Sequence, residues 1–317
     1  MCGGDHDGTG RRRGATVVMA LVALVSLAGL APAVDAKKKK KKVAAVTRSA
    51  TVPFTSGGTQ TVTASCPKGK HITGGGFAVA PNFVPSGSSG LRSITATSHS
   101  GGAKSWTASG SAFTNPTASG TYTTFARCER DALGQLTNTL STSGTLNPGV
   151  ITASSLNCAP GTHAVSGGYA GTGVSNLGNP LTFRLVVLQS RRTGPGQWTV
   201  TAYNSSLGPS PVPVTLTTYV LCERNGKGRA VSEGASASTP LVNDGRASAD
   251  ATCAKKQHAI SGGFVVTPNG IGSVPAVGVD EFNPVGQRGW HLGLHEWQAV
   301  VLPPGSAMQT FAYCKKG

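Results

Sequence analysis

The sequence predicts an all-β protein of three tandem repeats, each a small antiparallel β-sandwich or barrel closed by one disulfide. Three observations predict this fold. A cysteine-led motif recurs at intervals of 92 and 95 residues, as CPKGKHITGGGF, CAPGTHAVSGGY and CAKKQHAISGGF. A second cysteine follows each motif, and segments rich in alternating β-branched and aromatic residues fill the interval. No segment has the periodicity of a long amphipathic helix, and a period of this length suits one small β domain.

The first 36 residues are typical of a secretory signal peptide. Arg11 to Arg13 precede the apolar run VVMALVALVSLAGL, and small residues follow it. Cleavage after Ala33 and cleavage after Ala36 both fit. An uncleaved membrane anchor is the alternative, although an apolar run of about 14 residues is short for a span. We therefore expect a secreted protein, or one loosely associated with the cell wall, with no transmembrane span in the mature chain.

Six consecutive lysines follow this leader, within a segment 37–46 that we expect to be a disordered tail. Like charges in a block repel one another, so such a run is rarely part of a fold. The chain has a formal net charge of +16 at pH 7, and its other basic residues are scattered along the sequence. The tail is predicted to be an electrostatic tether to anionic envelope polymers, with a solubilising spacer as the alternative. Its residues are Lys37, Lys38, Lys39, Lys40, Lys41 and Lys42.

Six cysteines remain after the leader and can pair in 15 ways. A pairing within each repeat encloses similar separations of 62, 64 and 61 residues. A competing scheme joins the end of one repeat to the start of the next, but it leaves the first and last cysteines to pair across the whole protein. In a loop-entropy model each intra-repeat bridge stabilises the fold by roughly 4 kcal/mol. The expected repeats are 47–131, 132–225 and 226–317, with bridges Cys66–Cys128, Cys158–Cys222 and Cys253–Cys314.

The paired glycines of each motif predict close packing rather than catalysis. A glycine inside a strand costs about 0.5 to 1 kcal/mol, and it usually marks a bulge or a place where another group packs on bare backbone. One tryptophan in each repeat is the expected partner, with the aromatic residue after the glycines facing the core. The histidine of each motif is expected at a strand entrance, bonded to a backbone carbonyl. The structural motif comprises His71, Gly75, Gly76 and Trp106; His163, Gly167, Gly168 and Trp198; and His258, Gly262, Gly263 and Trp290.

Catalytic and metal sites are not predicted, and no cofactor is expected. No carboxylate or second histidine recurs beside the motif histidines in all three repeats, and one imidazole forms neither a zinc site nor a nucleophile–base pair. The segment WHLGLHEW places His291 and His295 on one strand face, with Glu296 and Asp280 nearby. A carboxylate could complete a metal site there. We favour a more polar outer face, because the common hydrolase and nucleotide-binding motifs are missing from the sequence.

The motif C-x4-H-x2-[GS]-G-G-[FY], together with the lysine-rich tail, resembles secreted proteins of high-GC Gram-positive bacteria that carry Cys-bracketed, Gly-Gly-containing β repeats. The resemblance covers about residues 37–317. It implies export and a β-repeat architecture, and it supplies no activity. The threefold repeat is also similar to β-prism and lectin folds. The long period and a cysteine pair in each repeat argue against a single prism.

These features predict an exported, non-enzymatic protein that binds or coats an extracellular or envelope surface. One alternative is an array of glycan-binding modules that gains avidity from three weak sites, with Phe83 and Trp297 as candidate loop aromatics. A hydrolase that uses the third repeat is the other alternative. Specific nucleic-acid binding is not expected, because aromatic and basic residues are not interleaved. The sequence leaves the oligomeric state open.

Overall fold

The structure is a computed structural model that describes residues 45–55, 59–80, 92–113, 119–130, 136–172, 185–205, 213–224, 231–236, 238–241, 246–267, 277–296 and 305–316. Its secondary structure consists of 19 strands and no helix in these ranges, and the named strands pair antiparallel. The predicted all-β class is therefore confirmed. None of the described segments forms a helix able to span a membrane. The predicted leader 1–36 and the lysines 37–42 lie outside the described residues.

The three repeats supply their strands in the same order. Repeat 1 forms β1 (Val46–Thr55), β2 (Thr59–Ser65), β3 (His71–Ala80), β4 (Arg92–Ser100), β5 (Ser105–Phe113) and β6 (Ser119–Glu129). Repeat 2 forms β7 (Leu136–Leu146), β8 (Ile151–Asn157), β9 (Thr162–Thr172), β10 (Leu185–Gly194), β11 (Gln197–Asn204) and β12 (Val214–Arg224). Repeat 3 forms β13 (Ser232–Ala235), β14 (Thr239–Pro240), β15 (Arg246–Thr252), β16 (Gln257–Thr267), β17 (Val277–Val285), β18 (Gly289–Glu296) and β19 (Ala307–Lys316).

Within a repeat, two three-stranded halves pack face to face and a disulfide joins them. In repeat 1 the halves are β1-β6-β3 and β2-β5-β4. The bridge runs from Cys66, just after β2, to Cys128 in β6. The other repeats carry the equivalent bridges Cys158–Cys222 and Cys253–Cys314. This confirms one intra-repeat disulfide in each of three two-layered β repeats.

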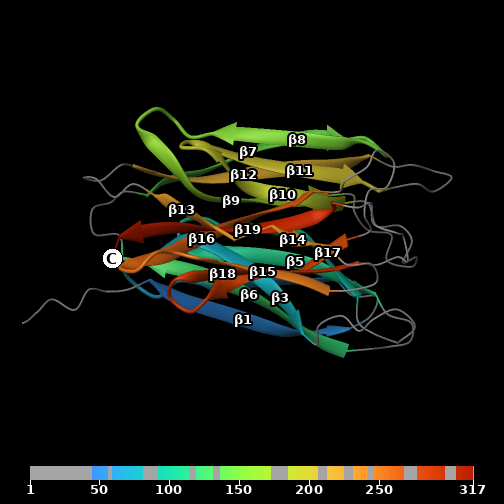
Figure 1. Ribbon diagram of the computed structural model, residues 1–317, viewed down its shortest axis with the longest axis horizontal. Helices are drawn as coiled ribbons and strands as arrows, with labels where there is room; N and C mark the ends of the chain where they lie inside the picture. Colours follow the sequence, from blue (N-terminus) through green and yellow to red (C-terminus); the bar gives the residue numbers. More distant parts are fainter. Residues whose placement is uncertain are drawn as a thin grey trace, which may run out of the picture. The chain divides into compact units, whose positions relative to one another are not determined.

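The sheets cross the repeat boundaries. Repeat 1 joins repeat 3 in the sheet β1-β6-β3-β17-β18-β15 and joins repeat 2 in the sheet β2-β5-β4-β9-β12-β7, while repeats 2 and 3 share β13-β19-β16-β10-β11-β8 (Figure 1). Each junction pairs only two residues on either strand, for example Ser98 with Tyr169 and Phe77 with Phe282. The cycle closes around an approximate threefold axis. The repeats therefore form one closed arrangement, a point that the sequence left open.

The first glycine of each pair lies against the tryptophan of its own repeat. A Cβ at this position would overlap the indole ring in all three cases. The tryptophans are fully enclosed between the two halves of each sandwich. The following aromatic residues, Phe77, Tyr169 and Phe264, are buried as well. The contacts are Gly75 with Trp106, Gly167 with Trp198 and Gly262 with Trp290.

The second glycine of each pair lies at the junction with a neighbouring repeat. A Cβ at Gly76 would overlap the carbonyl oxygen of Phe282, and one at Gly168 would overlap that of Ser98. A Cβ at Gly263 would lie 2.8 Å from the Cβ of Arg191 in repeat 2 and 2.7 Å from the hydroxyl of Tyr313. The two glycines thus have separate functions: the first admits a tryptophan, and the second allows two repeats to approach closely enough to share a sheet.

Candidate functional site

One end of the molecule collects the same three features from every repeat. The strands β3, β9 and β16 begin there, and β6, β12 and β19 end there, with β19 running to the C-terminus marked in Figure 1. The turns after β4, β10 and β17 lie at the same end. Their backbone carbonyls, at Ala103, Pro195 and Gln287, accept hydrogen bonds from the starts of β3, β9 and β16. We call this the basic end, because exposed lysines and arginines gather there.

The motif histidines meet the residues that follow the closing cysteines at the basic end. Lys315 Nζ lies 3.3 Å from Glu129 Oε2 and 2.5 Å from Glu223 Oε2. His258 of repeat 3 bonds through Nε2 to the carboxylate of Glu129 in repeat 1. A carboxylate is its partner, so the prediction of a backbone carbonyl was wrong for this histidine. The resulting axial cluster consists of His71, His163, His258, Glu129, Glu223 and Lys315.

A single lysine is paired with both carboxylates of the axial cluster. Repeats 1 and 2 place a glutamate after the closing cysteine, whereas repeat 3 places Lys315 there. Burial alone would raise the pKa of Glu129, but the hydrogen bond with His258 and the charge of Lys315 outweigh it and lower the pKa to about 2. Both effects favour the ionised carboxylate. A third carboxylate at this position would instead add repulsion between like charges.

His163 is held neutral beside this lysine. Burial is the main cause that lowers its pKa to about 4, and the charges of Lys315 and Arg192 act in the same direction. Glu223 lies 3.7 Å from His163 Nε2. Because that carboxylate is already paired with Lys315, it does little to raise the pKa of His163, and the effect of burial is larger.

Acidification should therefore destabilise the fold through His163. An unfolded chain binds a proton at its imidazole near pH 6.5, whereas the folded chain resists protonation until about pH 4. The contribution is complete above pH 6.5, and about 2 kcal/mol of it should be lost as the pH falls to 4, after allowance for solvent screening. Urea unfolding at stepped pH values would measure this loss. His163→Gln should flatten the profile in this window, and an unchanged profile would contradict the assignment. His291→Gln, at a partly exposed histidine, is the control.

The other two histidines of the third repeat, His291 and His295, contact carboxylates outside the axial cluster. His295 Nδ1 lies 2.5 Å from Asp280 Oδ2, and both side chains are buried. His291 Nδ1 lies 2.8 Å from Asp250 Oδ1 on the next strand. Arg246 bonds to Glu281 at 3.1 Å, which continues a row of ion pairs along this sheet. Among the described side chains, which do not include that of Glu296, no three His, Cys, Asp or Glu residues are placed to hold a metal ion.

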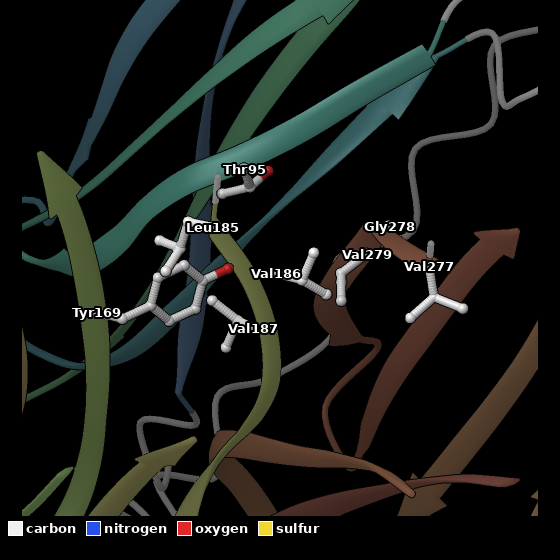
Figure 2. Close-up of a pocket in the computed structure, with 8 residues that line it drawn as sticks. All are labelled: Thr95, Tyr169, Leu185, Val186, Val187, Val277, Gly278 and Val279. Carbon is white, nitrogen blue, oxygen red and sulfur yellow. The ribbon is translucent and has the colours of Figure 1, made fainter. Parts of the chain in front are cut away.

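The strands of all three repeats also meet around a small cavity toward the opposite end (Figure 2). Its volume is about 20 Å³, which is room for one water molecule. The wall is mostly aliphatic, and its Thr95 hydroxyl is hydrogen-bonded to Tyr122 at 3.0 Å. Such a cavity cannot enclose a substrate. It is lined by Thr95, Tyr169, Leu185, Val186, Val187, Val277, Gly278 and Val279.

Exposed basic side chains from all three repeats surround the axial cluster. They lie in the turns that open β3 and β16, in the turns after β4 and β17, near the start of β1, and at or just beyond the ends of β6, β12 and β19. A hollow of about 290 Å³ beside Arg191 and Arg192 opens at the same end. The exposed residues are Arg48, Lys68, Lys104, Arg130, Arg224, Lys255, Lys256, Arg288 and Lys316.

Sequence reasoning missed this gathering, because the residues are scattered along the chain. The available signal was their position, since most of them stand within a few residues of a repeat cysteine or in the turn before the tryptophan. No protein-family model and no curated protein matches the chain at a significant level. The chemistry of the basic end is therefore the basis for a functional assignment.

Proposed function

We propose that the protein is exported and binds an anionic envelope surface without catalysing a reaction, with Lys37–Lys42 as an electrostatic tether. Export is supported by the leader in the sequence and by the three disulfides, since such bridges persist in oxidising compartments. The net charge of +16 favours an anionic partner.

The gathering of exposed basic side chains at one end carries this proposal. Strand β1 begins at that end, because Val46 pairs with Cys128. Lys42 stands only three residues before the buried Ala45, so the chain that carries the tail enters the fold there. Positive charge in the tail and positive charge on the fold can therefore attract the same surface.

Deleting Lys37–Lys42 should weaken sedimentation of the mature protein with isolated cell envelopes. Each lysine near an anionic surface contributes up to about 1 kcal/mol at low salt, and salt screens this attraction. Binding should thus fall on deletion and also on raising the salt concentration. Replacing the six lysines by glutamine is the matched control, because it keeps the length of a spacer and removes the charge. Binding that survives both the glutamine variant and high salt would exclude the tether.

A multivalent glycan-binding array is the second candidate, and a hydrolase in the third repeat is the third. The loop aromatics Phe83 and Trp297 lie outside the described residues. In the third repeat, Asp280 and His295 form a buried carboxylate–imidazole pair next to aliphatic and glycine residues of β17 and β18. Nucleophilic catalysis there would need a hydroxyl or thiol within hydrogen-bond reach of that imidazole. We favour a binding protein because basic side chains gather at one end of the fold.

A further inference from the structure

We propose that the basic end itself binds a linear, phosphate-bearing polyanion, independently of the lysine tail. This inference rests on the proposed function in one respect, the anionic nature of the target. It differs in assigning recognition to the folded repeats.

The carboxylates at the basic end do not offset its exposed positive charge. Glu129 and Glu223 are enclosed near the axis and paired with Lys315. Glu233, on β13, and Asp250, three residues before Cys253, are the exposed carboxylates near this end among the described residues, and Asp250 bonds to His291. The surrounding lysines and arginines come from all three repeats, so their fields add over the whole end.

Lys256 provides independent support, because its backbone conformation is unfavourable for a lysine. Its φ is +67°, and it is the only residue other than glycine with a positive φ in the described ranges. The equivalent positions in repeats 1 and 2 are Gly69 and Gly161, with φ of +76° and +79°. Glycine adopts this conformation without strain, whereas a side chain does not. A lysine kept at a glycine position points to a use for its charge.

The distribution of apolar side chains favours a hydrated polymer over a lipid bilayer. Proteins that enter a membrane interface bury apolar side chains in it. Among the described residues, Val285 is the one large apolar side chain exposed at the basic end, whereas Val150 and Ile151 are exposed at the opposite end. Lysine and arginine bind phosphate oxygens through charge-assisted hydrogen bonds. Basic side chains spread over separate turns can contact successive phosphates of a flexible chain.

The test uses the mature protein without residues 37–42 and inorganic polyphosphate as the probe. A basic-end variant carries Lys68→Gln, Lys255→Gln and Lys256→Gly. A matched control carries Thr61→Glu, Thr145→Glu and Val150→Glu, which lower the net charge equally at exposed positions of the opposite end. Affinity is measured by titration at several salt concentrations.

We expect the basic-end variant to lose about tenfold or more in affinity and its salt dependence, as the slope of log K against log salt, to fall by about 2. The control should stay within about twofold of the parent. The single variant Lys256→Gly should lower affinity while it raises the midpoint of urea unfolding. If Lys256→Gly lost binding through misfolding, both the affinity and the urea midpoint would fall. That result would overturn the proposal that Lys256 contacts the polyanion.

Three other results would overturn the inference. Equal losses in the two triple variants would show that net charge alone determines binding. Binding to phosphatidylglycerol vesicles but not to polyphosphate would assign the basic end to a bilayer. If the parent binds neither probe while the tailed protein still sediments with envelopes, the basic end fails and the proposed function stands. Polyphosphate binding combined with tail-independent sedimentation would support the basic end and exclude the tether.

Discussion

Replacing Arg127 by alanine should lower the free energy of unfolding by about 3 to 5 kcal/mol, because buried backbone carbonyls lose hydrogen bonds and a large side chain leaves a cavity. The side chain is fully buried, and its guanidinium links repeat 1 to repeat 3. Nε donates to the carbonyl of Ala259 at 2.8 Å, and Nη2 donates to that of Gln287 at 2.8 Å. Nη1 donates to the hydroxyl of Thr47 and to the carbonyl of Gly286. Alanine would remove these hydrogen bonds and would also leave a cavity, and the carbonyl of Gln287 would keep only its bond from the N–H of Ala259.

A hydrogen bond to a neighbouring repeat is made by the residue before the closing cysteine in two of the three repeats. Tyr313 of repeat 3 accepts a hydrogen bond at 2.8 Å from the backbone N–H of Arg192, near the end of β10 in repeat 2. Repeat 2 has Leu221 at this position, where no polar group is offered. Burial lowers the pKa of Arg127 to about 10, so the guanidinium stays charged at neutral pH.

Equilibrium unfolding in urea with intact disulfides would measure the effect at Arg127. Arg127→Lys keeps the charge but lacks the planar fork that spans several carbonyls, so it should recover only part of the loss. Arg130→Ala, at an exposed arginine three residues further along, should change stability by less than about 0.5 kcal/mol. A loss below about 1 kcal/mol for Arg127→Ala would contradict the link between repeats.

Substituting Gly168 by alanine should destabilise the protein by about 3 kcal/mol or more, which is the upper range for overpacking. The added Cβ would overlap the carbonyl oxygen of Ser98 in the neighbouring repeat. Because β4 and β9 pair through only two residues on each strand, the junction has few other contacts to keep it closed. Backbone atoms must move to relieve the overlap, since no flexible side chain is involved.

Gly144→Ala is the matched control for this substitution. Gly144 lies in strand β7, which pairs with the same strand β12, and nothing lies within 4 Å of its added Cβ. Alanine there should be neutral or stabilise by up to about 1 kcal/mol. Hydrogen exchange should show faster exchange in β4 and β9 for Gly168→Ala alone. Equal stability of the two variants would exclude close approach of the backbones as the reason for the second glycine.

The local parts of this fold could be predicted from the sequence, because their signals are periodic. Alternation of polar and apolar residues identified strands, and similar spacings identified the disulfides such as Cys66–Cys128. The tryptophan expected over the glycines lies there, as Gly75 and Trp106 show. The two glycines of each pair have different reasons, however. The contact of the second glycine, such as Gly76, with another repeat was not anticipated. A period of two gives the faces of a strand, but it does not name the strand beside it.

The axial cluster could not be predicted either, because the sequence does not say which strands of different repeats lie side by side. The letters after the closing cysteines, ER, ER and KK, were visible in the sequence. Their meaning depends on the closure of the three repeats, which brings Glu129, Glu223 and Lys315 to one axis. In separate domains these side chains would be ordinary surface charges. Once the repeats close, a lysine rather than a third glutamate is needed after the last closing cysteine, because Lys315 offsets repulsion between Glu129 and Glu223.

Closure around the axis also fixes the copy number of the repeat. In an open solenoid each unit offers a free interface, so units can be gained or lost during evolution at little cost. In this protein repeat 3 pairs back onto repeat 1 through β17 and β3, which leaves no interface for a fourth unit. Losing one unit would expose the inner strands of both others as unpaired edges, which favour aggregation.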